Sequence, residues 1–106
     1  MSPVIEAATP PLPVSKPELV GMSPARLARI RPAMEREIAA GKLPGCVVAI
    51  VRDGKLVHLE AIGWQDPESR TPMQADAIFS IASMTKPVAG VTALSLIEEG
   101  RLLITD

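Results

Sequence analysis

The chain has 106 residues, enough for one small domain with a modest hydrophobic core. Hydrophobic residues make up 47% of it, which excludes a generally disordered chain, and aromatic residues make up only 2%, so the core must be aliphatic. The formal net charge is −1 and the basic residues are dispersed. Because phosphate binding needs clustered positive charge, this pattern argues against a nucleic-acid surface.

The single cysteine and the single histidine limit the possible metal chemistry. Cys46 alone excludes an internal disulfide and a cysteine-based zinc site, and we expect it to act as a small hydrophobe where a strand begins. His58 lies on an alternating segment with Leu56 and Glu60 on its own face, so we expect a solvated or half-buried side chain. The sequence therefore predicts no metal site and no cofactor.

The N-terminal stretch lacks the pattern of a secretory signal, which needs positive residues followed by an apolar run of about 7–15. Residues 2–17 are instead rich in proline and include Glu6. No apolar stretch approaches the roughly 18 residues of a membrane span, because Gly90 and the charges near Glu98 interrupt the best candidate. We therefore expect a cytoplasmic protein that does not bind membranes.

Residues 1–21 carry five of the eleven prolines, which predicts an extended tail lying along the surface of a domain formed by residues 22–106. Ser23 and Pro24 predict the start of the first helix, since serine is a good N-cap and proline suits the first helical position. The apolar stripe of this helix is formed by Leu27, Ile30, Met34 and Ile38.

Two residues modify this first helix. Pro32 falls inside the helical pattern, so we expect a kink or a local break near it. Gly41 follows the last residues of the stripe and predicts the C-terminal end of the helix at about Ala40.

A β-hairpin is predicted next. Residues 46–51 form an unbroken apolar run rich in valine, typical of a strand covered on both faces. Asp53-Gly54 is a favoured two-residue hairpin turn, because both positions must tolerate positive φ. Residues 55–62 form the returning strand, and residues 63–76 are predicted to be a polar loop.

A second long helix is predicted to begin near Ser83 and to end before Gly100. Pro87 falls within about its first turn, where backbone N–H groups often lack partners. The order helix, hairpin, loop, helix predicts an α+β fold with helices packed on an antiparallel sheet.

The start of this helix carries the most informative residues. In Ser83-Met84-Thr85-Lys86, a hydroxyl nucleophile and an amine lie three residues apart on one helix face, so Lys86 can reach Ser83 as its base. The alternative is that Ser83 only caps the helix and Lys86 is a solvated first-turn residue. However, a lysine in the first turn opposes the helix dipole, and such local violations occur at functional sites.

The surrounding residues resemble the serine β-lactamase and penicillin-binding-protein superfamily, and most closely its class C-like esterases. The resemblance covers roughly residues 20–106 and includes the nucleophile motif Ser-x-x-Lys. It is carried by the segments Phe79–Pro87, Glu98–Leu102, Met22–Leu27 and Gly41–Gly45.

The resemblance implies a β-lactamase-like fold and a catalytic pair, Ser83 and Lys86. In such enzymes the serine attacks a carbonyl and forms an acyl-enzyme, which water or an alcohol then resolves. The backbone N–H of Ser83 is implied as one oxyanion donor, with a later strand supplying the second. Lys86 must lose its charge to act as a base, which burial and neighbouring positive potential promote.

One departure from the family pattern is large. The chain contains no tyrosine for a Tyr-x-Asn element and no Lys-Thr-Gly triplet. We therefore interpret it as an incomplete N-terminal portion of a longer hydrolase, nearly inactive alone, whose expected partners are a small ester or amide substrate and the missing C-terminal segment. The first interpretation is a carboxylesterase; a β-lactamase, a D-Ala-D-Ala peptidase, and a non-catalytic fragment or interaction module are the alternatives.

Overall fold

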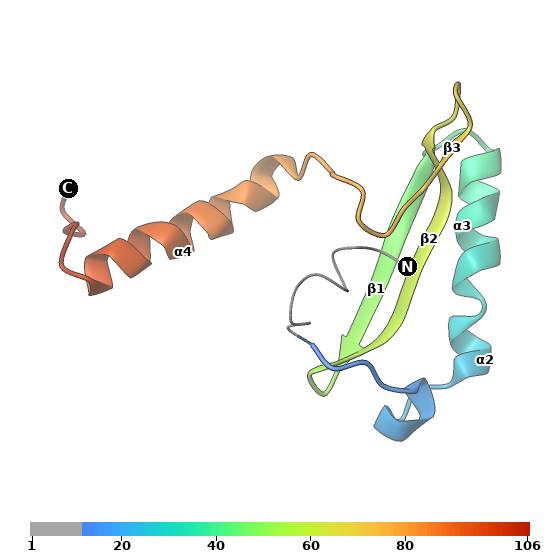
Figure 1. Cartoon of the computed structure of the whole chain (residues 1–106), viewed down its shortest axis with the longest axis horizontal. Helices are drawn as coiled ribbons and strands as arrows, with labels where there is room; N and C mark the ends of the chain where they lie inside the picture. The colour runs from blue at the N-terminus through green and yellow to red at the C-terminus, as the bar shows by residue number, and fades with distance from the viewer. Residues whose placement is uncertain (1–11) are drawn as a thin grey trace.

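The structure is a computed structural model that describes residues 12–106 (Figure 1). It confirms the α+β class and the predicted order of helix, hairpin, loop and helix, with a three-stranded antiparallel sheet in the strand order β1-β2-β3. The elements are the 3-10 helix η1 (Pro17–Val20), α2 (Pro24–Leu27), α3 (Ile30–Ala39), β1 (Gly45–Arg52), β2 (Lys55–Asp66), β3 (Thr71–Pro72), the 3-10 helix η2 (Ala82–Met84) and α4 (Thr85–Glu98).

The first predicted helix is present as two pieces. The Ser23 side chain accepts a hydrogen bond of 3.3 Å from the Arg26 N–H, which caps α2 as predicted. The expected break is confirmed, but it lies at residues 28–29, between α2 and α3. Because Pro32 has no N–H to donate to the carbonyl four residues earlier, the helix opens one turn before the proline. α3 ends at Ala39, just before Gly41 with its φ of 76°.

The predicted hairpin is confirmed. β1 and β2 pair antiparallel across a turn in which Asp53 and Gly54 have φ values of 52° and 71°, the positive values that a type I′ turn requires. The prediction for residues 63–76 was wrong in part, because β2 continues to Asp66 and β3 pairs with it. A two-residue strand carries too little periodicity to be recognised in a sequence.

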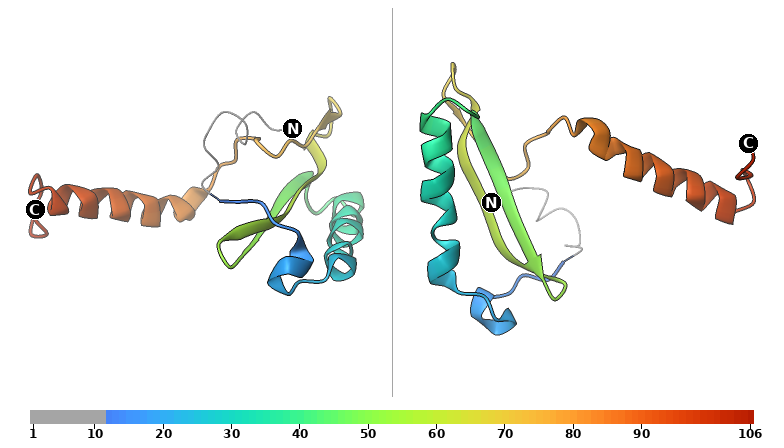
Figure 2. Two further views of the ribbon diagram at one scale, coloured as in Figure 1. Left: turned by 60° about the horizontal axis from the view of Figure 1, so that its bottom comes forward. Right: turned by 180° about the vertical axis from the view of Figure 1, so that it is seen from behind.

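α3 packs against one face of this hairpin (Figure 2). Val48 and Glu60 are direct partners across the β1–β2 pair and so lie on the same face. Arg31 of α3 donates from Nε to Glu60 Oε1 at 2.5 Å and from Nη2 to the Ala61 carbonyl at 3.1 Å, which identifies this face as the one under α3. Ile62 lies on the same face and is the most deeply buried side chain described, at 1% exposure. The core therefore lies between α3 and β2.

The opposite face of the hairpin is less protected. Val51 of β1 and Leu59 of β2 remain 47% and 36% exposed. Among residues 12–106, β1 pairs only with β2, so its other edge carries free backbone groups. The prediction that residues 46–51 are covered on both faces is therefore not met within the described part of this chain, because α3 packs on one face only.

Part of the predicted N-terminal tail lies against the sheet. The Leu56 N–H donates to the Pro13 carbonyl at 2.8 Å, and the Ser15 N–H donates to the Leu56 carbonyl at 3.0 Å. These bonds form an isolated parallel bridge between Val14 and Leu56 on the outer edge of β2. The 3-10 helix η1 follows within the same predicted tail, whose residues 1–11 lie outside the described part of the chain.

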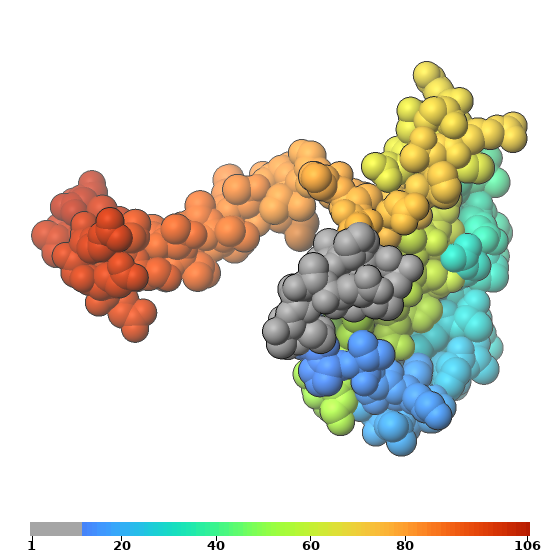
Figure 3. Space-filling view, viewed as in Figure 1, coloured from blue at the N-terminus to red at the C-terminus, as the bar shows by residue number. Residues whose placement is uncertain are grey.

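α4 points away from the sheet, to which a segment without regular structure connects it (Figures 1 and 3). The radius of gyration, 18.0 Å, exceeds the roughly 13 Å of a compact chain of this length. Thus α3 packs on the sheet as predicted, whereas α4 does not. We refer to residues 12–73 as the sheet unit and to residues 74–106 as the arm.

Candidate functional site

Ser83 lies in the turn that leads into α4. It is the middle residue of η2, and this turn is closed by a hydrogen bond of 3.0 Å from the Met84 N–H to the Ile81 carbonyl. α4 then begins at Thr85, so the helix starts two residues later than predicted and is preceded by a 3-10 turn. The Ser83 side chain is exposed, and it precedes the end of α4 that is nearer to the sheet unit (Figure 1).

The geometry weakens the interpretation of Ser83 as a helix cap. Ile81 and Met84 occupy the N-cap positions of η2 and α4, and neither helix has a side-chain cap hydrogen bond. The Ser83 hydroxyl therefore does not satisfy a backbone N–H at either helix start. A serine hydroxyl that has no structural role in the turn remains available for chemistry.

Ser83 and Lys86 lie three residues apart across this helix start. Ser83 belongs to η2 and Lys86 to the first turn of α4, a spacing at which helical residues share a face. Within residues 12–106 no hydrogen bond joins the two side chains, and both are exposed. The burial that promotes loss of the lysine proton is thus not supplied by the described residues.

Ala82, immediately before Ser83, has a φ of 46°. This residue was missed at the level of sequence, because alanine carries no preference for positive φ that a pattern could reveal. Backbone strain of this kind costs about 1–3 kcal/mol and is concentrated at functional sites. An unusual backbone conformation therefore directly precedes the predicted nucleophile.

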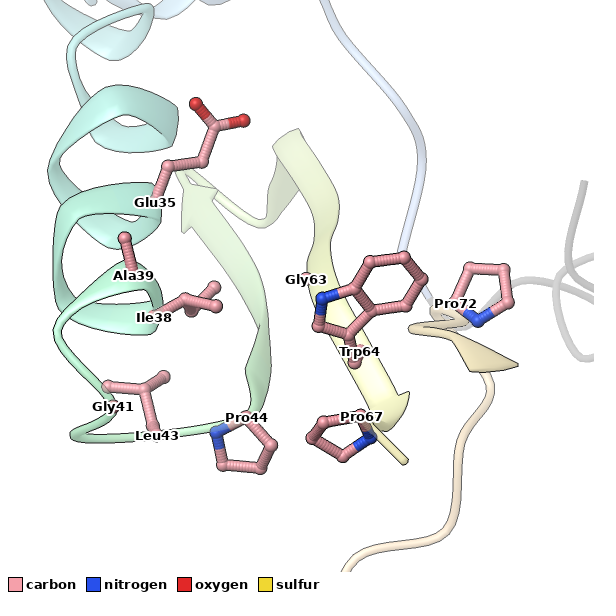
Figure 4. Close-up of a pocket in the computed structure, with 10 residues that line it drawn as sticks. All are labelled: Glu35, Ile38, Ala39, Gly41, Leu43, Pro44, Gly63, Trp64, Pro67 and Pro72. Atoms are coloured by element: carbon pink, nitrogen blue, oxygen red, sulfur yellow. The ribbon is translucent and has the colours of Figure 1, made fainter. Parts of the chain in front are cut away.

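A cleft lies elsewhere, at the end of the sheet unit where α3 finishes (Figure 4). It encloses about 800 Å³, with Ile38 and Leu43 on the side of α3 and Trp64 and Pro72 on the side of the strands. Neither Ser83 nor Lys86 lines it. A shallow apolar groove of about 340 Å³ starts at Pro87, directly after Lys86, and is therefore nearer to the proposed chemistry.

A group of charged side chains joins α3 to β2 on the covered face of the sheet. Glu60 accepts from Arg31, and its second oxygen lies 2.9 Å from His58 Nε2. Hydrogen bonds from Arg31 to Glu60 and then to Glu35 raise the pKa of the guanidinium. His58 is half-buried and shares a face with Glu60, as the strand pattern predicted. This group fastens α3 to the sheet and involves neither Ser83 nor Lys86.

Cys46 is half-buried as a free thiol. Burial, and secondly the Glu60 carboxylate, raise its pKa, while Arg31 acts in the opposite direction. A raised thiol pKa lowers the thiolate fraction, so Cys46 is a poor candidate for a nucleophile.

No three His, Cys, Asp or Glu side chains in residues 12–106 are placed to hold a metal ion together. None of the helices described there has both the length and the apolar character needed to cross a membrane.

The Beta-lactamase family model matches residues 28–106. Protein Rv1367c of Mycobacterium tuberculosis (strain ATCC 25618 / H37Rv) is 44% identical over 72 residues, which are 67% of this chain and 18% of that protein. Esterase EstB of Burkholderia gladioli is 31% identical over 77 residues, 73% of this chain and 20% of the esterase. Protein flp of Staphylococcus aureus (strain NCTC 8325 / PS 47) is 33% identical over 73 residues, which are 69% of this chain and 15% of that protein. The chain spans about a fifth or less of the length of these relatives.

Proposed function

The chain belongs to the Beta-lactamase family, and from this premise we propose that it carries the nucleophile segment of a carboxylesterase that works through an acyl-enzyme. The family points to serine hydrolases, and one relative is named an esterase. The observation that carries the proposal is the three-residue spacing of Ser83 and Lys86 across a helix start, with no capping hydrogen bond to the serine hydroxyl.

In the proposed reaction, Lys86 in its neutral form accepts the hydroxyl proton while Ser83 Oγ attacks the ester carbonyl. The carbonyl π electrons move to oxygen, and a tetrahedral oxyanion forms. When this intermediate collapses, the bond to the leaving alkoxide breaks, the alkoxide takes a proton from the lysine, and an acyl-serine remains. Attack by water then reverses these steps and releases the carboxylic acid.

The Ser83 N–H supports this chemistry. No backbone carbonyl in the described part of the chain accepts it, because Ser83 lies in the first turn of η2. A free N–H beside the attacking oxygen can donate to the oxyanion. Loss of one such donor typically lowers the rate about 10²–10³-fold.

The full activity requires more than these residues. Lys86 is exposed, and a second oxyanion donor has to come from another part of the full-length protein. A β-lactamase or D-Ala-D-Ala peptidase would share the acylation step, so the acyl acceptor and leaving group are what distinguish the enzyme alternatives. The named esterase among the relatives supports the choice of an ester substrate.

The proposal is tested by labelling the full-length protein with a fluorophosphonate and locating the added mass by peptide mass spectrometry. We expect the label on the peptide that contains Ser83, and its complete loss in Ser83→Ala. Ser80→Ala is the matched control, because Ser80 precedes the same turn and is also exposed. Labelling that survives Ser83→Ala, or is lost in Ser80→Ala instead, would overturn the assignment.

A further inference from the structure

Met84, the residue directly after the proposed nucleophile, carries an exposed thioether. It is the last residue of η2 and occupies the N-cap position of α4. A hydrogen bond of 3.0 Å from its N–H to the Ile81 carbonyl fixes its backbone, whereas the residue as a whole remains 71% exposed. The sulfur of Met84 is therefore presented to solvent from a defined turn.

Exposure distinguishes Met84 from the other methionines of residues 12–106. Met22, Met34 and Met73 are half-buried, and Met73 lies where the sheet unit ends, with its N–H donating to the Gly63 carbonyl. An oxidant must reach the sulfur lone pairs, so the oxidation of a methionine follows its accessibility. Met84 is thus the methionine most open to oxidation in the described part of the chain.

The position of Met84 also brings its sulfur close to the proposed chemistry. Consecutive Cα atoms are about 3.8 Å apart, and the unbranched methionine side chain is flexible enough to bring its sulfur toward the Ser83 hydroxyl. Substrate has to reach Ser83 for the reaction to occur. Hydrogen peroxide is smaller than any ester, so we expect the same entrance to admit it to Met84 when further residues cover α4.

We propose that Met84 is an oxidation-sensitive site, at which a peroxide converts the thioether to a sulfoxide and thereby slows acylation of Ser83. The inference rests on the proposed function of Ser83 and adds a chemical modification that regulates it. A sulfur lone pair attacks one peroxide oxygen, the O–O bond breaks, the sulfur–oxygen bond forms, and the second oxygen leaves as water after a proton transfer. The sulfur loses two electrons and the peroxide gains them. Methionine sulfoxide reductases, which draw electrons from thiols, reverse the change.

The sulfoxide changes the surroundings of Ser83 in a way that opposes acylation. Oxidation converts a flexible apolar side chain into a polar one, whose oxygen carries partial negative charge. Negative charge also develops on the carbonyl oxygen of the ester when Ser83 attacks it. Because like charges repel more strongly where water is excluded, the barrier to acylation should rise. We expect the rate to fall about tenfold, less than the 10²–10³-fold loss of one oxyanion donor.

The test treats the proposed longer protein with hydrogen peroxide at increasing doses. Peptide mass spectrometry measures the addition of one oxygen at Met84, and the burst of a p-nitrophenyl ester of a short-chain acid measures acylation. We expect the acylation rate to fall in step with the fraction of Met84 sulfoxide. It should return to its starting value after treatment with methionine sulfoxide reductases A and B together, since each enzyme reduces one sulfoxide epimer.

Three variants assign the effect to Met84. Met84→Leu conserves the side-chain volume and removes the sulfur, so it should acylate at about the parent rate and resist peroxide. Met73→Leu is the matched control in the sheet unit, and Cys46→Ala removes the only cysteine of the chain. Both controls should stay as sensitive to peroxide as the parent. Repair by the reductases is measured on the unsubstituted protein, which keeps the test decisive even if Met84→Leu does not fold.

The possible failures are distinguishable. If the untreated protein takes no fluorophosphonate label at Ser83, the proposed function is wrong and the regulation falls with it. If Ser83 is labelled but Met84 gains no oxygen at doses that oxidise free methionine, or gains it without slowing acylation, only the role of Met84 is overturned. The same conclusion follows if peroxide inactivates Met84→Leu as much as the parent, or if the reductases do not restore the parent.

Discussion

The sheet unit and the arm differ in how far their apolar side chains are buried. In the sheet unit, α3 covers one face of the hairpin and Ile62 is almost completely buried. In the arm, Val88, Val91 and Leu94 of α4 are 61%, 64% and 59% exposed. A helix that is apolar around its whole circumference normally lies inside a larger core. The comparison teaches that the sheet unit contains a helix that covers one face of its hairpin, whereas α4 has a sequence suited to surroundings that residues 12–106 do not supply.

The proposed chemistry lies in the less supported region. Ser83 and Lys86 lie at the start of α4, while the Arg31–Glu60 ion pair and the cleft beside Trp64 belong to the sheet unit. A lysine that acts as a base needs a low-dielectric environment to lose its proton. Any additional segment that packs on α4 would also bury the start of that helix and so exclude water from Lys86. We therefore expect activity and the packing of α4 to depend on the same additional residues.

The largest expected effect comes from Lys86→Arg. Arginine keeps the positive charge but stays protonated, so it cannot accept the Ser83 proton. Ester turnover by the full-length protein should fall by about 10²–10⁴-fold, the usual contribution of a general base, with little change in KM. Lys55→Arg makes the same change in the sheet unit and should leave turnover unaltered. Near-normal turnover in Lys86→Arg would show that Lys86 is only a positive neighbour.

Amide hydrogen exchange in the isolated 106-residue chain compares the stability of the sheet unit with that of the arm. Amides paired between β1 and β2 should be protected, since their hydrogen bonds belong to the hairpin that α3 covers. Amides of α4 should exchange almost as fast as in an unfolded peptide, because isolated helices shorter than about 12–15 residues are marginal in water.

The reference for this measurement is the proposed longer protein, in which α4 should become strongly protected. Equal protection of α4 and β1 in the isolated chain, together with a cooperative monomeric thermal transition, would show that the arm is autonomous. That result would favour the interaction-module alternative.

A pair of glycine substitutions should act with opposite sign in the two regions. Gly63 has a φ of 80°, and an added Cβ would lie 2.7 Å from Ile38 Cδ1 and 2.8 Å from the Pro44 carbonyl oxygen. Gly63→Ala should therefore lower the free energy of unfolding by roughly 2–4 kcal/mol, through backbone strain and overpacking. Gly90 lies inside α4 with nothing within 4 Å of an added Cβ. Gly90→Ala should favour the helix by about 1 kcal/mol.

The two effects are measured differently. Urea unfolding followed by the fluorescence of Trp64, the only tryptophan, reports on Gly63→Ala, and far-ultraviolet circular dichroism of the isolated chain reports on Gly90→Ala. In the full-length protein, a loss of stability in Gly90→Ala would indicate that another segment approaches the α4 backbone at this glycine. A stabilising Gly63→Ala would contradict the packing described for the sheet unit.

The sequence predicted best those features that a few neighbouring residues determine. Asp53-Gly54 specified the turn, and Ser23-Pro24 specified the start of α2, because each depends on local backbone chemistry. The break near Pro32 was expected. It lies one turn earlier because Pro32 has no N–H to donate to the carbonyl of the residue four positions before it.

Features that depend on distant residues were not predictable. β3 exists only because Thr71 and Pro72 return beside β2, and the apolar run of β1 could not show which of its faces α3 would cover. In the candidate site, the interpretation of Ser83 and Lys86 as a pair rests on their spacing and stays a prediction. The positive φ of Ala82 could not be predicted, since the surrounding structure imposes it against the preference of alanine.

The smallest expected effect is a dependence of the free energy of unfolding of the sheet unit on pH. Burial raises the pKa of the Cys46 thiol, so the fold favours the protonated form. Above the ordinary thiol pKa of about 8.5 the unfolded chain binds fewer protons than the folded chain, and the free energy of unfolding should fall as pH rises. The decrease begins near that value, ends once pH exceeds the raised pKa, and stays below about 1.4 kcal/mol per pH unit, the limit for one proton.

Cys46→Ala isolates this contribution. Urea unfolding of the parent and of Cys46→Ala is compared between pH 7 and pH 10, so that titration of lysines and other groups cancels in the difference. We expect the difference to be flat near neutral pH and to change only in the alkaline part of the range, with native Cys46 alkylated by iodoacetamide more slowly than the unfolded thiol. A difference that is independent of pH, with equal alkylation rates in both states, would mean that α3 leaves the start of β1 open to water, and that the sheet unit is less self-sufficient than its contacts indicate.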